Sequence, residues 1–173
     1  MSAEAVPFHT IPEPPASVTA GTILGRLADG IGFRFRWASE GLKDSDMAYK
    51  PAPDCMSMGE QLDHICDLLA TVSKNVGAPQ RPPLPQPAAC AQLRARVLDL
   101  SADLSAWFKR ASEEELASST VKSRGDARLF WNMINGPLAD CLTHIGQILS
   151  WRRLAGAPPA AADVFRGLPP KGF

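Results

Sequence analysis

The chain has 173 residues, of which 45% are apolar and 21% charged, and its 18 basic residues balance its 18 acidic ones at a formal net charge of zero. This composition is typical of an ordinary globular protein, and the lack of a basic excess argues against nucleic acid or an anionic lipid surface as a partner. No apolar run reaches the roughly 18 residues that a membrane-spanning helix needs. We therefore expect one globular domain that binds neither nucleic acid nor membrane.

The first 15 residues contain four prolines and show little helical periodicity. Residues 1–15 are therefore expected to form a flexible arm ahead of a single domain at 16–173, which ends in a short tail. The arm has neither the basic region nor the apolar stretch of a signal peptide. The four cysteines are scattered without a CxxC pair, which is typical of reduced thiols and favours a cytoplasmic protein.

Apolar residues recur at steps of three and four in several segments, which predicts long amphipathic helices. The clearest stripe consists of Met58, Leu62, Ile65, Leu69, Val72 and Val76. The predicted helices span 17–41, 57–76, 89–111 and 135–155. Four such helices without a confident strand predict an all-α fold, a four-helix bundle.

The ends of these helices carry recognisable signals. Ser57 with Glu60 three residues later has the form of a capping box, and Gly77 is a suitable stop. Five prolines at 79–87 predict a stiff connection without regular structure between the second and third helices. Beyond the third helix, the sequence predicts a short helical turn after Ser112, an extended loop at 121–126 and a helix start at Asn135-Gly136-Pro137.

Two of the three histidines, His64 and His144, lie within predicted amphipathic helices, where an unpaired imidazole is costly to bury. Asp140 precedes His144 by four residues and shares its helical face. If the second and fourth helices pack side by side, two imidazoles and one carboxylate meet in a set that suits a divalent metal. The plainer interpretation makes Asp140 and His144 an ion pair within one helix and His64 a residue at the core boundary.

Three further residues are candidates for a pocket or an outer shell around this site. Gln147 and Trp151 continue the face of Asp140 and His144 at steps of three and four residues. Gln147 could equally be a polar residue at the helix boundary. Trp37 and Trp151 could wall a pocket, although core packing is the default for tryptophan in a bundle.

The segments Leu62-Asp63-His64-Ile65 and His144-Ile145-Gly146-Gln147 resemble the metal-ligand segments of the DinB-like superfamily. Three further stretches are similar to one branch of it: 33–42, 131–140 and 151–153. The resemblance covers about residues 17–167. It implies a four-helix bundle with a crossover connection and a divalent metal at one end. Members include bacterial thiol-dependent transferases and proteins described as metal-dependent hydrolases.

Members of the superfamily carry an HxxxH pair on the last long helix, and Asp140 stands where the first of these histidines is expected. The resemblance therefore implies a metal held by His64 and His144, with Asp140 either a third ligand or an outer-shell partner of His144. The cofactor would be a divalent metal, with Zn, Ni, Fe and Mn all open. If Asp140 in place of the expected histidine has left the site degenerate, the protein would bind no metal.

Two functions of different classes follow. As an enzyme, the chain would use the metal to lower the pKa of a water or thiol. The superfamily implies thiol transfer, isomerisation or hydrolysis on a small electrophile, with a low-molecular-weight thiol or another small molecule as substrate. The alternative is a non-catalytic bundle that binds a small ligand or acts under stress. Surplus apolar residues (Phe33, Trp37 and Trp151) also predict a homodimer.

Overall fold

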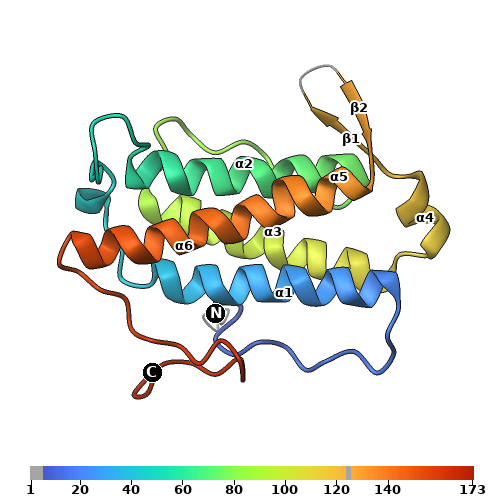
Figure 1. Ribbon diagram of the computed structural model, residues 1–173, viewed down its shortest axis with the longest axis horizontal. Helices are drawn as coiled ribbons and strands as arrows, with labels where there is room; N and C mark the ends of the chain where they lie inside the picture. Colours follow the sequence, from blue (N-terminus) through green and yellow to red (C-terminus); the bar gives the residue numbers. More distant parts are fainter. Residues whose placement is uncertain (1–5, 124–125) are drawn as a thin grey trace.

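The computed structural model describes residues 6–123 and 126–173. Four long helices dominate them: α1 (Ala20–Ser39), α2 (Met58–Val76), α3 (Cys90–Arg110) and α6 (Ala139–Leu154). They pack side by side in an all-α bundle (Figure 1), which confirms the predicted all-α class. Helices α1, α2 and α3 lie within their predicted ranges, whereas α6 begins four residues later than predicted. Among the described residues, no helix combines the length and the apolar character needed to cross a membrane.

The predicted end signals of α2 are confirmed. The amide of Glu60 donates to Ser57 Oγ at 3.2 Å, and the amide of Ser57 donates to Glu60 Oε2 at 2.6 Å. Gly77 ends the helix with φ of 74°, a left-handed conformation that glycine adopts without steric cost. Similar signals bound α1, where Thr19 and Thr22 form a capping box. The starts of α1 and α2 are therefore encoded locally.

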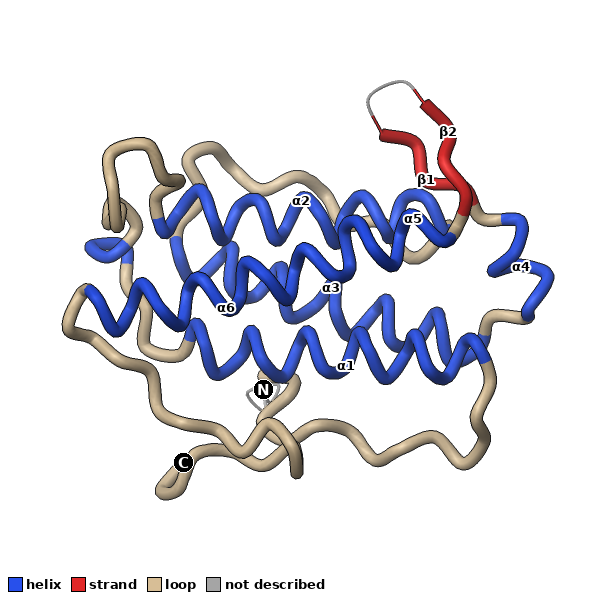
Figure 2. Tube along the Cα trace, viewed as in Figure 1, coloured by secondary structure: helices blue, strands red, loops and turns tan. Residues whose placement is uncertain are grey.

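Each of α1 and α2 packs against both α3 and α6, so α1 and α2 lie on opposite sides of the bundle. A short 3₁₀ turn, η1 (Asp44–Asp46), lies in the connection between α1 and α2. Helices α2 and α3 run in the same direction, and the segment between them returns along the bundle (Figure 2). That segment, residues 78–89, has no regular secondary structure, as its prolines predicted. Arg81 fixes it to α3 through Asp103 at 2.8 Å and Asp99 at 3.0 Å.

Several short elements connect α3 to α6. Helix α4 (Glu113–Ser118) is capped by Ser112 as predicted, and it leads into an antiparallel hairpin of β1 (Thr120–Ser123) and β2 (Asp126–Leu129). The prediction of a loop at 121–126 is wrong for 121–123, which form most of β1, and for 126, which begins β2, and residues 124–125 lie outside the described part. Helix α5 (Trp131–Met133) and a π-helical turn, η2 (Ile134–Leu138), complete the connection. Asn135 lies within this turn and caps no helix, which corrects the predicted start.

The two terminal segments cross over α1 and contact each other. Residues 6–15 contain no helix or strand, yet Phe8 is buried against Gly32, where a β-carbon would lie 2.4 Å from the Phe8 ring. The amide of Ile11 donates to the Gly167 carbonyl at 2.9 Å. The ring of Phe173 packs edge-on against Trp37. The part of the arm at residues 1–5 lies outside the described residues.

Candidate metal centre

His64, Asp140 and His144 meet where α2 and α6 pack together. Nε2 of His64 lies 3.7 Å from Asp140 Oδ2, and Nε2 of His144 lies 3.4 Å from Asp140 Oδ1. The two imidazole rings are nearly perpendicular, with centroids 4.7 Å apart. The structure thus brings together the three residues that the sequence singled out as candidate ligands.

The geometry of this triad fits a divalent ion. One ligand atom from each residue can be chosen so that all lie within 4.8 Å of one another. Around a tetrahedral ion with bonds of about 2.1 Å, neighbouring ligand atoms lie about 3.4 Å apart. The two His–Asp distances are close to this value, and the three ligand atoms together span no more than 4.8 Å, so the group could hold such an ion. The exposed fraction of the side chain is 13% for His144, 37% for His64 and 44% for Asp140, which leaves one side of the site open to solvent.

The imidazole of His144 is oriented by two amide side chains. Nδ1 of His144 lies 2.8 Å from Gln147 Oε1, and Gln61 Nε2 on α2 donates to the same oxygen and also contacts Nδ1. In the tautomer that carries its proton on Nδ1, His144 donates to the Gln147 oxygen, which can only accept. The lone pair of that tautomer lies on Nε2, the nitrogen that faces Asp140.

Gln61 is the site residue that sequence reasoning missed. Its side chain is 1% exposed, and its Oε1 has no hydrogen-bond partner among the described residues. A signal was present, because Gln61 precedes His64 by three residues just as Gln147 follows His144 by three. Both amides therefore share a helical face with their histidine. A buried glutamine with one orphaned oxygen is costly, so its position indicates a constraint beyond packing.

The π-helical turn η2 sets the position of Asp140. Gly136 has φ of −91° and ψ of −113°, which are not helical, and Pro137 has no N–H to donate. Regular α-helix resumes at Ala139, so Asp140 lies in the first turn of α6, where the helix dipole favours a carboxylate. Single π-helical turns occur frequently at functional sites.

The tryptophans proposed for the pocket lie elsewhere. Trp37 is buried between α1 and the terminal segments, where its Nε1 donates to the His9 carbonyl at 3.3 Å and its ring contacts Phe173. Trp151 is buried in the core one turn beyond Gln147. Of the three proposed outer residues, only Gln147 has a hydrogen bond to the triad within the described chain.

The cysteines near the ligands are unsuited to the chemistry of the site. Burial raises the pKa of the Cys66 thiol to about 11 and that of Cys141 to about 12. Both remain protonated at neutral pH, whereas metal binding and nucleophilic attack need the thiolate. Neither belongs to the ligand group formed by the triad.

Comparison with known proteins gave no relatives from which a function could be transferred: no protein-family model matches the chain, and no curated protein matches it. The evidence for the site is therefore its geometry.

Proposed function

We propose that the chain is a DinB-like four-helix bundle protein that binds one divalent metal through His64, Asp140 and His144 and acts on a small electrophile. The observation that carries the proposal is the convergence of two imidazole nitrogens and a carboxylate from two helices within 4.8 Å. The assignment to the superfamily is supported by the same-direction pair α2 and α3, the long return segment between them, and ligands on the second and last long helices.

The protein's own groups prepare the site for such chemistry. Gln147 accepts from Nδ1 of His144 in the tautomer that presents Nε2, and Asp140 faces both histidines. When bound, a divalent ion would lower the pKa of a water or thiol at an open position and polarise the electrophile. The solvent-exposed side of His64 and Asp140 leaves room for these small reactants. The reaction class is transfer of a thiol, isomerisation or hydrolysis.

Metal content is the direct test. The untagged protein would be purified without chelator and dialysed in turn against Zn²⁺, Ni²⁺, Fe²⁺ and Mn²⁺. Elemental analysis should find near-stoichiometric retention of at least one metal, and the double variant His64→Ala/His144→Ala should lose it. The control is His9→Ala, which changes the histidine that contacts Trp37 and should leave metal content unchanged. Wild-type protein that retains none of the four metals would refute the proposal.

Variants of Asp140 test whether its carboxylate is a ligand. Asp140→Ala removes the oxygens that face both histidines and should weaken metal binding about tenfold or more. Asp140→His restores the three-histidine set and should preserve or strengthen binding. Equal affinity in the wild type and Asp140→Ala would assign the carboxylate no part in holding the ion.

The alternative function is a non-catalytic bundle in which the triad is only a His–Asp–His ion-pair network. It is favoured by the two His–Asp distances, 3.7 and 3.4 Å, which are those of ion pairs without any ion. The same metal analysis separates the two proposals, and activity with a low-molecular-weight thiol and an aryl halide decides whether a bound metal is catalytic.

Homodimer formation remains a proposal, but the three residues from which the sequence predicted it do not support it. Phe33, Trp37 and Trp151 are all buried within the chain and offer no surface to a second copy. A dimer would have to use other apolar side chains, such as the fully exposed Phe165. Light scattering across micromolar concentrations measures the mass.

A further inference from the structure

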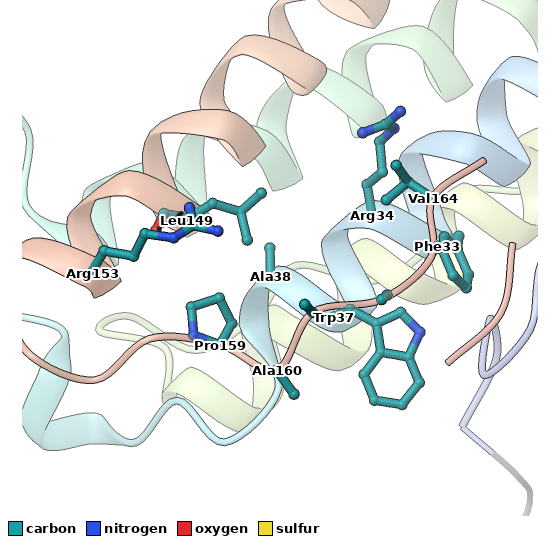
Figure 3. A pocket seen from close by; sticks show the side chains of 11 residues that line it. Phe33, Arg34, Trp37, Ala38, Leu149, Arg153, Pro159, Ala160 and Val164 are labelled. Atoms are coloured by element: carbon teal, nitrogen blue, oxygen red, sulfur yellow. Dashed lines mark hydrogen bonds between the residues drawn. The ribbon is translucent and has the colours of Figure 1, made fainter. Parts of the chain in front are cut away.

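A cavity of about 230 Å³ lies between α1, α6 and the C-terminal segment 159–164, and none of the triad residues lines it (Figure 3). Its apolar lining comes from both helices and from the segment that covers them: Phe33, Trp37, Ala38, Leu149, Pro159, Ala160, Ala161, Ala162 and Val164. Arg34 and Arg153 are the two charged residues of the lining.

The C-terminal segment 159–164 covers the cavity without filling it. The covering segment consists largely of alanines, whose short side chains leave space above Trp37 and Leu149. The segment is fixed rather than loose, because Asp163 pairs with Leu168 in a β-bridge and Gly167 accepts a hydrogen bond from Ile11. A hollow with a tethered cover keeps its shape without a ligand, which lowers the entropic cost of binding one.

The two arginines at this cavity lack counterions. Arg153 donates to the Leu149 carbonyl of its own helix at 3.2 Å, and neither it nor Arg34 forms an ion pair within the described residues. By contrast, Arg36 of α1 and Arg94 of α3 each form an ion pair with Glu40. Figure 3 shows Arg153 extending from α6 along Leu149 above Pro159.

No acidic residue lines the cavity. Asp163, the nearest acid in the covering segment, accepts hydrogen bonds from the amides of Phe165 and Arg166 at 3.2 and 3.0 Å. Both arginines are exposed to solvent at the rim of the apolar hollow, and within the described residues neither has an acidic partner, an arrangement that suits an anion with an apolar body.

We propose that this cavity binds a small apolar monocarboxylate. Its ring or short acyl chain contacts Trp37, Phe33 and Leu149, and its carboxylate pairs with Arg153, while Arg34 adds positive potential. A volume of about 230 Å³ is smaller than the roughly 300–1,000 Å³ of sites for drug-sized ligands, which limits the ligand to a single ring or a short chain. The site is separate from the triad and needs no metal.

Isothermal titration of the full chain in the presence of EDTA tests the proposal, with phenylacetate as the probe. Phenylacetate should bind, and the neutral phenylacetamide should bind at least tenfold more weakly, because it lacks the charge that pairs with Arg153. Arg153→Gln should weaken phenylacetate about tenfold and Arg34→Gln severalfold. Arg110→Gln, a change at the exposed end of α3 outside the cavity, should have no effect.

A variant that fills the cavity locates the site. Ala160→Phe places a ring in the covering segment and should abolish phenylacetate binding, while far-UV circular dichroism and the chemical shifts of the α2 amides, which lie outside the cavity, stay unchanged. Absence of phenylacetate binding, equal binding of the amide, or an equal loss in Arg110→Gln would each overturn the proposal. Inorganic phosphate serves as the test for simple anion attraction, and its binding as tightly as phenylacetate would also overturn it.

Discussion

The contact between α1 and α3 differs from the contact between α2 and α6 in how closely the helices approach and in the polar groups that they bury. On one side α1 and α3 approach so closely that a β-carbon on Gly21 would lie 2.4 Å from the Phe108 carbonyl oxygen. There the buried carboxylate of Asp29 accepts from Ser105 Oγ at 2.5 Å and from Lys109 Nζ at 2.7 Å. The Asp29 carboxylate therefore has a partner on each of its oxygens where the two helices meet.

On the other side α2 and α6 carry the polar cluster and an irregular helix start. The triad is partly open to solvent, Gln61 has an orphaned oxygen, and a π-helical turn precedes α6. The comparison indicates that α1 and α3 pack backbone against backbone around one paired carboxylate, whereas α2 and α6 hold groups that a purely structural interface would exclude. Incomplete satisfaction of buried polar groups is typical of functional sites.

The largest effect on stability is expected from breaking the ion pair between Asp29 of α1 and Lys109 of α3. Lys109→Met leaves the Asp29 carboxylate buried with Ser105 as its remaining partner and should lower the free energy of unfolding by about 3 kcal/mol. Urea denaturation measures it. The double variant Lys109→Met/Asp29→Leu should recover part of the loss, because no charge is then left unpaired. Lys74→Met, at an exposed position on α2, is the control and should change stability by less than about 0.5 kcal/mol.

The next effect tests the close approach of α1 and α3. Gly21→Ala should cost about 2 kcal/mol of unfolding free energy, because backbone atoms of α3 cannot move away from the added methyl group. Gly30→Ala, in the same helix with open space around it, should instead stabilise by up to about 1 kcal/mol. Equal effects of the two substitutions, measured by thermal or urea denaturation, would mean that the helices are not in such close contact.

On the polar side, Gln147→Leu should lower metal affinity about tenfold to a hundredfold, because the Nδ1–H of His144 loses its acceptor and the ring is no longer oriented. Gln61→Leu should act in the same direction. Competition with a chromophoric chelator measures the affinities, and Gln80→Leu, in the connection between α2 and α3, is the control. Unchanged affinity in both site variants would show that the amides do not position the imidazole.

The smallest effect concerns the thiols of Cys66 on α2 and Cys141 on α6. At pH 8 a thiol with a pKa of about 11, such as Cys66, is ionised to about one part in a thousand, and Cys141, with a pKa of about 12, even less. Both should resist iodoacetamide in the folded protein, whereas the partly exposed Cys55 should react first. Mass spectrometry after brief labelling identifies the modified residues. Rapid labelling of Cys141 would reveal local opening of α6.

How much of the fold and of the site could be predicted depended on how many residues each sequence pattern spans. The stripe from Met58 to Val76 repeats for five turns, and two histidines on such helices could be paired once the second and fourth helices were assumed to pack side by side. The strands β1 and β2 have four residues each, too few to show alternation, so the hairpin was missed.

Tertiary contacts explain the other misses. Phe8 is buried against Gly32, which follows it by 24 residues in the sequence. Trp37 contacts His9 near the N-terminus and Phe173 at the C-terminus. No local pattern encodes such contacts. The same is true of Gln61, whose burial depends on α6.

The order of helices in space has a consequence for synthesis of the chain. Helix α1 packs against α3 and α6 but not against its neighbour in sequence, so its partners are made only after α2 and the long return segment. At about 5–20 residues per second, α1 waits on the order of ten seconds on the ribosome before α3 is complete. During that time the face that carries Ile31 and Phe35 has no helix to cover it, which makes nascent α1 a substrate for chaperones that bind exposed apolar segments.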